Sequence, residues 1–256
     1  MNKHLPRRRF GQNFLSAPSV VDAIVRAIDP QPDDHMVEIG PGLGVLTEPL
    51  LQKLNHLHVV EIDRDLVSRL QARFPPDKLS IHAGDVLDFD FACIPAPFRV
   101  VGNLPYNIST ELLFQLQKFA SSMIDGHFML QREVVERMVA MPSTSAYGRL
   151  SVMLQFRFEM EKLIDVPPES FRPAPKVDSA VVRMRPLGAS RLAVCDEAKL
   201  GEVVTTAFTQ RRKTLRNALG KVMDASALQG LRIDPQLRPE NLSVADYVRI
   251  ARSLKA

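Results

Sequence analysis

The chain has 256 residues, of which 45% are hydrophobic and 24% charged, proportions typical of an ordinary globular protein. No stretch approaches the roughly 18 consecutive apolar residues of a membrane-spanning helix. The basic N-terminus is not followed by the apolar segment of a secretory signal. We therefore expect a cytoplasmic protein with one large domain, or with one domain and a smaller second one.

The net charge of +4 is spread unevenly along the chain. The segment 188–256 carries 12 basic and 7 acidic residues, and residues 1–9 contain Lys3, Arg7, Arg8 and Arg9. The part between them is mildly acidic. Two basic ends would suit a polyanionic partner held from two sides, although a solvated basic surface gives the same pattern.

In chain order, short apolar runs alternate with stretches of helical spacing. The expected strands are residues 35–40, 57–62, 79–82 and 98–101, and the expected helices are 45–54, 64–74, 110–119 and 134–139. Strand and helix in alternation predict an α/β fold with a parallel sheet covered on both faces.

The pattern changes in the last part of the chain. Residues 161–166 and 180–184 are expected as strands of an antiparallel hairpin at the sheet edge. After Pro186 the periodicity is helical, which includes one helix face through Val203, Ala207, Leu215 and Leu219. We therefore divide the chain into a sheet domain, 1–187, and a small helical domain, 188–256.

A glycine-rich turn, Gly40-Pro41-Gly42-Leu43-Gly44, joins the first expected strand to a helix. Glycines let the backbone approach a ligand closely, whereas Pro41 removes an amide donor that a pyrophosphate would use. Acidic residues end three successive strands: Glu38, Glu61 and Asp85. This acidic edge favours a cationic nucleoside such as S-adenosylmethionine over a dinucleotide, with Glu61 placed to accept the ribose hydroxyls.

The fourth strand ends in Asn103-Leu104-Pro105-Tyr106, which is either a simple turn or a catalytic loop. An arylamine nitrogen is a poor nucleophile and needs acceptors for its two N–H bonds. The Asn103 amide oxygen and the Leu104 carbonyl can supply them, Pro105 stiffens the turn, and Tyr106 can stack on the base. The base must be single-stranded or flipped out to reach such a site.

Three further groups of residues have both a functional and a structural interpretation. Phe171, in a proline-rich loop, is a candidate for the second face of the base or a core anchor. Arg211, Arg212, Lys213 and Arg216 are expected on one helix, as phosphate contacts or as a solvated face, and Arg7, Arg8 and Arg9 are similar candidates. Cys93 and Cys195 lack metal-ligand spacing, so we expect buried free thiols and no metal.

Four segments together resemble the ribosomal RNA adenine dimethylases, in particular those that act on small-subunit (16S) rRNA. They are Arg9–Leu15 (RFGQNFL), Val37–Gly42 (VEIGPG), Gly102–Ser109 (GNLPYNIS) and Phe171–Ser179 (FRPAPKVDS). The resemblance covers nearly the whole chain, including Gln210–Asn217 (QRRKTLRN).

The resemblance implies a Rossmann-like S-adenosylmethionine-dependent methyltransferase core with a small all-α C-terminal domain. The reaction would be N6,N6-dimethylation of two adjacent adenosines near the 3′ end of 16S rRNA in the immature small ribosomal subunit, with a role in its maturation. Asp85 would hold the cofactor adenine amine, Glu61 the ribose, and the segment with Gln12 and Asn13 would fold over the cofactor. The implied cofactor contacts are Asn13, Leu15, Gly40, Glu61, Asp85 and Asn103.

Two alternatives stay open. The first is another amino-methyltransferase, acting on large-subunit rRNA, DNA adenine or a protein glutamine amide. Leu104, where many DNA and glutamine enzymes have proline, disfavours the last two. The second is a non-catalytic ribosome assembly factor, against which the intact Asn103, Tyr106, Glu61 and Asp85 argue.

Overall fold

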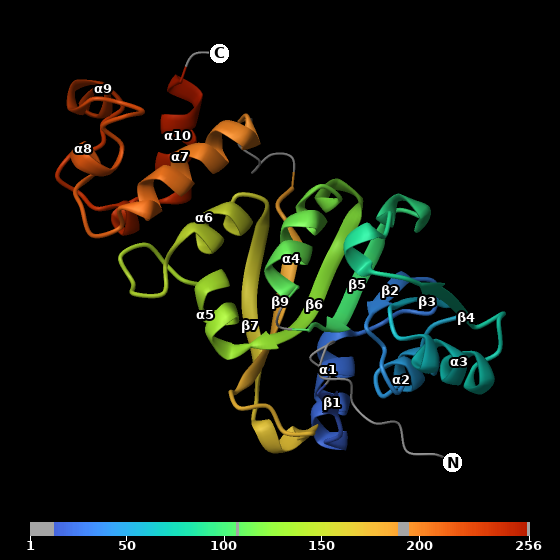
Figure 1. The fold of residues 1–256 in the computed structure, drawn as a ribbon. Coiled ribbons are helices and arrows are strands. Elements are labelled where there is room, and N and C mark those ends of the chain that lie inside the picture. Colours follow the sequence, from blue (N-terminus) through green and yellow to red (C-terminus); the bar gives the residue numbers. More distant parts are fainter. Residues whose placement is uncertain (1–12, 106–107, 189–194, 255–256) are drawn as a thin grey trace. The chain divides into compact units, whose positions relative to one another are not determined.

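The computed structural model describes residues 13–105, 108–188 and 195–254 (Figure 1). Its strands are β1 (Phe14–Leu15), β2 (His35–Ile39), β3 (Leu57–Glu61), β4 (Leu79–Ala83), β5 (Phe98–Asn103), β6 (Met123–Gln131), β7 (Phe158–Val166), β8 (Phe171–Arg172) and β9 (Ser179–Pro186). Its α-helices are α1 (Pro18–Ile28), α2 (Thr47–Leu51), α3 (Arg64–Arg73), α4 (Ser109–Gln117), α5 (Arg132–Met138), α6 (Arg149–Gln155), α7 (Glu197–Thr209), α8 (Leu215–Ala218), α9 (Ala225–Gly230) and α10 (Val244–Ser253).

Seven strands form one sheet in the order β4-β3-β2-β5-β6-β9-β7. Strands β4, β3, β2, β5 and β6 pair in parallel, which confirms the parallel sheet expected from the alternating pattern. Strand β9 runs antiparallel to β6, and β7 is the edge strand beyond it. The chain order reverses at β2 and β5, so a crevice is expected at their carboxyl ends.

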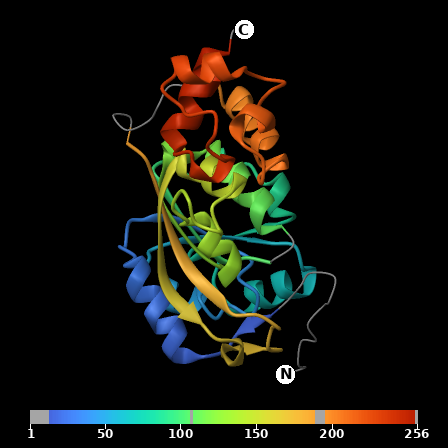
Figure 2. The same cartoon turned by 90° about the vertical axis from the view of Figure 1, so that its left-hand side faces the viewer.

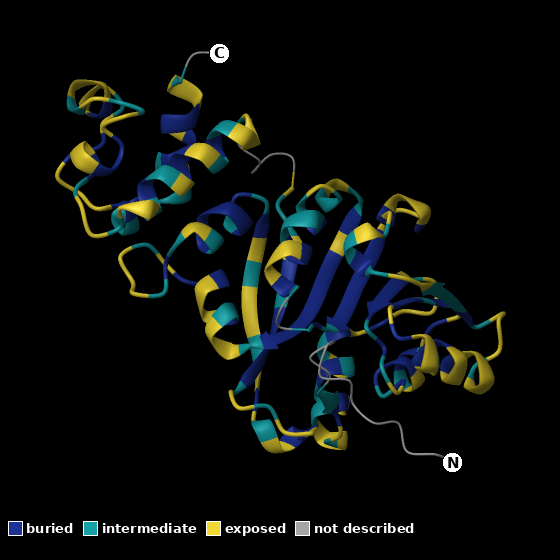
Figure 3. Cartoon of the chain, in the orientation of Figure 1, coloured by how far each residue is buried: buried dark blue, intermediate teal, exposed yellow. Residues whose placement is uncertain are grey.

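The central strands form because their residues are apolar on both faces. Strands β2, β5 and β6 are buried along nearly their whole length, whereas β7 is largely exposed or half-buried (Figure 3). Helix α3 shows the local signals of a surface helix: the Asp63 carboxylate accepts from the Asp65 N–H at 3.1 Å, and Leu66, Val67 and Leu70 are buried.

One large hydrophobic cluster joins α1, α2 and α3 to the same face of the sheet. Its members include Ile24 and Ile28 of α1, Leu50 at the end of α2, and the strand residues Met36 and Val59. The small two-stranded sheet, in which β1 pairs antiparallel with β8, lies beside this core and contributes Leu15 and Phe171 (Figure 2).

A buried ionic network closes the core at the amino ends of the strands. Arg99 Nε and Nη2 donate to Asp125 at 2.9 and 2.8 Å, and Nη1 donates to Asp34 at 2.8 Å. The same guanidinium donates to the carbonyls of Ile28 and Asp29 at the end of α1. The fork geometry of arginine lets one side chain tie α1, β5 and β6 together.

The helical part differs from the sequence expectation in one respect. Helix α7 ends at Thr209, so Arg211, Arg212 and Lys213 lie in a turn, and only Arg216 lies in a helix, α8. The reason is tertiary: the Leu215 and Arg216 N–H groups donate to the carbonyls of Leu237 and Pro235. These bonds replace the ones that would continue the helix from α7.

The chain divides into two compact units, one of Met1–Val135 with Met160–Pro186 and the other of Glu136–Glu159 with Leu187–Ala256. The expected boundary between a sheet domain, 1–187, and a helical domain, 188–256, stays a proposal.

The expectation of buried thiols is wrong, because Cys93 is exposed at a surface turn and Cys195 is half-buried. Within the described residues, no helix is both long and apolar enough to span a bilayer.

Candidate functional site

The glycine-rich turn between β2 and α2 has a backbone that side chains other than glycine rarely adopt. Gly40, Gly42 and Gly44 have φ values of +63°, +59° and +79°. The turn is closed by the Gly44 N–H, which donates to the Pro41 carbonyl at 2.9 Å. The turn forms one wall of a pocket of about 340 Å³, a size usual for small-molecule sites.

Two buried carboxyl groups lie under this turn. The Glu61 carboxylate accepts from the N–H groups of Gly42 and Asp63 at 3.2 and 2.9 Å, and the Thr47 hydroxyl donates to Glu38 at 2.7 Å. Burial raises the pKa of Glu38 to about 7, the Thr47 hydrogen bond opposes that rise, and Glu61 adds to it. Burial also raises the pKa of Glu61 against its backbone hydrogen bonds.

The third acid, Asp85, follows β4 at the same edge of the sheet. One of its carboxylate oxygens caps a short 3₁₀ turn, Val86–Asp88, by accepting from the Leu87 N–H at 3.0 Å. Apolar side chains directly after two of the acids, Ile62 and Val86, also line the pocket. Flat apolar walls beside carboxylates suit a nucleoside, whose base is apolar on its faces and polar at its edge.

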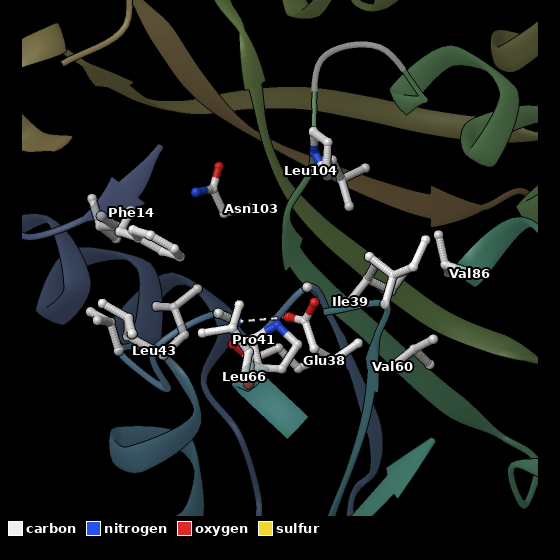
Figure 4. Close-up of a pocket in the computed structure, with 18 of the residues that line it drawn as sticks. Phe14, Glu38, Ile39, Pro41, Leu43, Val60, Leu66, Val86, Asn103 and Leu104 are labelled. Carbon is white, nitrogen blue, oxygen red and sulfur yellow. Dashed lines mark hydrogen bonds between the residues drawn. The ribbon is translucent and has the colours of Figure 1, made fainter. Parts of the chain in front are cut away.

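Asn103 and Leu104 enter the pocket from the end of β5 (Figure 4). The Leu104 side chain is 1% exposed, and its N–H donates to the Met129 carbonyl at 3.1 Å, so this backbone is fixed. Before it stands Gly102, where a Cβ would lie 2.6 Å from the Ile39 carbonyl. Glycine at this position lets β2 and β5 come close enough to bring the turn and Asn103 into one pocket.

The first described residues of the chain complete the pocket. The Asn103 side-chain nitrogen donates to the Asn13 carbonyl at 3.1 Å. The Phe14 ring lies so close to Gly42 that a Cβ there would be 3.1 Å from it. The pairing of β1 with β8 and the Ser16 N–H bond to the Ser170 carbonyl hold this segment in place.

The pocket therefore brings together eight of the ten catalytic and cofactor-binding residues expected from the sequence. Those that line it are Asn13, Leu15, Gly40, Glu61, Asp85, Asn103, Leu104 and Pro105. Tyr106 and Arg7, Arg8 and Arg9 lie outside the described residues.

Phe171, expected either against the base or as a core anchor, does not line the pocket. Its side chain is 2% exposed and packs in the hydrophobic cluster with Leu15, because β8 pairs with β1 at this position. Its position fits the alternative of a core anchor for the loop.

The four C-terminal basic residues differ in their surroundings. Arg211 Nε donates to Glu240 at 2.6 Å, and its Nη2 donates to the Ser145 carbonyl at 2.7 Å. Arg212, Lys213 and Arg216 are exposed. Of the four side chains, that of Arg211 is the one that makes hydrogen bonds to other described residues of its own unit.

Several lining residues were missed by the sequence reasoning. The sequence pattern places Glu38 at the acidic edge but does not indicate its hydrogen-bond partner, Thr47, which lies behind the pocket wall outside the lining. The apolar lining residues Phe14, Ile62 and Val86 are each a direct sequence neighbour of an expected site residue. For Ile62, the pattern of an apolar residue directly after an acid at a strand end could have indicated a pocket wall, and the structure shows this side chain 43% exposed. Among the described residues, no three His, Cys, Asp or Glu side chains group as metal ligands.

Comparison with known sequences gives a consistent result over the full length. The sequence profile of the family described as ribosomal RNA adenine dimethylase matches residues 3–256. Ribosomal RNA small subunit methyltransferase A of Chromobacterium violaceum is 62% identical over 255 residues, covering 99% of this chain and 97% of the relative. The protein of the same name from Aromatoleum aromaticum is 59% identical, covering 100% and 97%.

Solved structures agree on the fold. A dimethyladenosine transferase from Plasmodium falciparum superposes with a TM-score of 0.81 at 26% identity, covering 93% of this chain and 95% of that one. A 23S rRNA methyltransferase gives a TM-score of 0.74 at 25% identity, covering 94% and 99%. The core is thus Rossmann-like, as in these methyltransferases, and carries C-terminal helices.

Proposed function

The chain belongs to the ribosomal RNA adenine dimethylase family, and from that premise we propose that it dimethylates the N6 amines of two adjacent adenosines near the 3′ end of small-subunit (16S) rRNA. The observation that carries the proposal is the convergence of Asn103 and Leu104 with the acidic, glycine-lined pocket. The acceptor base and the methyl donor can meet only where these two parts adjoin.

S-adenosylmethionine fits the donor set of the pocket. Its described lining residues include three acids and no Lys, Arg or His, and they offer apolar walls at Ile62 and Val86. When bound, this cofactor supplies an electrophilic methyl group on a sulfonium. We propose that Glu61 accepts hydrogen bonds from its ribose, Asp85 from its adenine amine, and that Asn13, Leu15 and Gly40 enclose it.

The residues at the end of β5 act on the acceptor base. Because its side-chain nitrogen is engaged by the Asn13 carbonyl, Asn103 presents its oxygen as an acceptor. The Leu104 carbonyl is the second acceptor, held by the buried side chain and the bond to Met129. Two acceptors on one amine orient its lone pair toward the donor and stabilise the charge that develops on nitrogen. Pro105 stiffens the turn, and Tyr106 is proposed to stack on the base.

The substrate particle and its location complete the proposal. We propose that the RNA is presented in an immature small subunit in the cytoplasm, where the enzyme also takes part in maturation. Exposed Arg212, Lys213 and Arg216, with Arg7, Arg8 and Arg9, are proposed phosphate contacts, which position RNA without reading its sequence. Arg211 is a weaker candidate because of its bond to Glu240.

The similarity to a 23S rRNA methyltransferase, which is 25% identical, supports the alternative of a large-subunit substrate. The 62% identical small-subunit methyltransferase is the much nearer relative and favours the small subunit. To separate them, the purified protein is incubated with radiolabelled S-adenosylmethionine and equal amounts of undermethylated small subunits, large subunits or DNA. Label confined to small-subunit RNA is the expected result. Label on large subunits or DNA, or on nothing, contradicts it.

A further inference from the structure

Glu38 is a buried acid that the proposed reaction does not use. It is 2% exposed, and the hydroxyl of Thr47, which is 0% exposed, donates to it. Among the described residues that line the pocket, the other charged groups are acidic as well: Glu61 at the end of β3 and Asp85 after β4. Helix α2 contributes the neutral Thr47 and β5 the neutral Asn103.

Like charges in a partly desolvated pocket repel, so the pocket needs a compensating positive charge. Without a cationic ligand, a proton on one carboxyl group provides it. Glu38 is the carboxyl group that most readily takes this proton. Burial and the neighbouring Glu61 raise its pKa to about 7, and they outweigh the Thr47 hydrogen bond, which lowers it. Near neutral pH this group is therefore divided between its acid and carboxylate forms.

We propose that Glu38 loses a proton to solvent when the cationic cofactor binds and regains one when the cofactor has become neutral at sulfur. The carboxylate is favoured beside a sulfonium, and it loses that partner once the methyl group has left. The site thereby prefers the substrate form of the cofactor over its thioether product, which assists product release. This inference rests on the proposed cofactor.

The first test compares S-adenosylmethionine with S-adenosylhomocysteine by titration calorimetry at pH 7, in buffers of different ionisation enthalpy. Both ligands carry the same ammonium and carboxylate groups, so the difference between them reports the sulfonium. We expect the release of about half a proton with the sulfonium ligand and a clearly smaller release with the thioether. The ratio of the two affinities should rise about tenfold between pH 6 and pH 8.

Variants assign the proton to Glu38. Glu38→Gln keeps the shape and should abolish both the difference in proton release and the pH dependence of the ratio. Thr47→Val removes the hydrogen bond that lowers the pKa of Glu38, so the midpoint should move to higher pH, which a purely structural role would not produce. It also tests the inference if Glu38→Gln does not fold. The control is Glu48→Gln, an exposed carboxylate of the same helix paired with Arg73, which should change neither readout.

The outcomes separate this inference from the proposed function. Equal proton release with the two ligands, or a pH-dependent ratio that persists in Glu38→Gln, overturns the inference while the cofactor assignment stands. If the protein binds neither ligand, the cofactor assignment fails and the inference fails with it.

Discussion

The side-chain nitrogen of Asn103 donates a hydrogen bond to the backbone carbonyl of Asn13, 3.1 Å away, across 90 residues of sequence. This bond fixes which end of the amide faces the pocket. Since the nitrogen is engaged by Asn13, the oxygen is the end of the amide left to accept a hydrogen bond in the described part of the chain, and an acceptor is what an adenosine amine requires. The N-terminal segment thus orients the side chain expected to bind the base.

Asn103→Ala removes that acceptor without removing the pocket. We expect methyl transfer to fall about a hundredfold to a thousandfold, the usual effect of losing one polar group at the reacting atoms, while particle binding persists. Asn103→Asp keeps an acceptor oxygen but loses the donor to Asn13, so its transfer rate should lie between that of wild type and that of Asn103→Ala. Single-turnover transfer rates and a filter-binding assay with small subunits measure the two properties. A wild-type rate in Asn103→Ala contradicts the assigned role.

Gly102→Ala tests the close approach of β2 and β5. The new Cβ would lie 2.6 Å from the Ile39 carbonyl, which belongs to backbone and cannot rotate away. We expect a loss of about 1–3 kcal/mol in the free energy of unfolding, measured with urea, together with weaker cofactor binding. The control is Gly188→Ala, where a Cβ also meets nothing within 4 Å and which does not line the pocket. Equal effects of the two substitutions would show that the contact does not matter.

Arg99→Met should destabilise the chain strongly, because it removes the guanidinium that pairs with the buried Asp125 and the half-buried Asp34. A loss of about 3–5 kcal/mol in the free energy of unfolding is expected at pH 7. Arg73→Met, at an exposed pair with Glu48, should cost less than about 1 kcal/mol. A small loss for Arg99→Met would mean that the buried network does not support the fold.

The same network predicts the direction of the pH dependence. Burial alone would raise the pKa of Asp125, but the neighbouring His127 and Arg99 outweigh it and lower the pKa to about 2. Arg99 makes the short contacts, since His127 Nδ1 is 3.6 Å away. A lowered carboxylate pKa stabilises the fold above the unfolded value of about 3.8, and this stability is lost as pH falls toward 2. The difference in the free energy of unfolding between wild type and Arg99→Met, measured with urea, should therefore become smaller below pH 4.

The C-terminal basic residues should separate into two classes. Arg211→Ala breaks the bonds to Glu240 and Ser145 and should lower the stability of its unit by roughly 1 kcal/mol. Arg212→Ala and Arg216→Ala should leave stability within about 0.5 kcal/mol. Each should weaken RNA binding and reduce the slope of log affinity against log salt by about 1. If the salt slope is unchanged in both Arg212→Ala and Arg216→Ala, these two residues do not contact RNA phosphates.

The parts of the site that depend on local pattern could be predicted from the sequence. A buried strand that precedes Gly40 and another that ends in Glu61 mark the carboxyl edge of a parallel sheet, and the structure places both residues in one pocket. Helix α1 was missed although Val21, Ile24 and Ile28 have helical spacing and Pro18 stands at its start, a usual first-turn position.

The parts that depend on distant partners could not be predicted. The sequence around Phe171 allows both a base-stacking and a core position, because nothing near it in sequence indicates its pairing with Leu15. The helix expected through Arg211 ends early because Leu215 and Arg216 find backbone acceptors at Leu237 and Pro235. In both cases tertiary contacts outweigh a local preference.

The most direct test of the central claim is to identify the methylated nucleoside. Small subunits from a strain lacking the modification are incubated with the protein and radiolabelled S-adenosylmethionine, and their RNA is digested and separated by chromatography. The account predicts that the label appears as N6,N6-dimethyladenosine, from two adjacent adenosines of the small-subunit RNA. Label in any other nucleoside, or none with a protein that binds the cofactor, would contradict it.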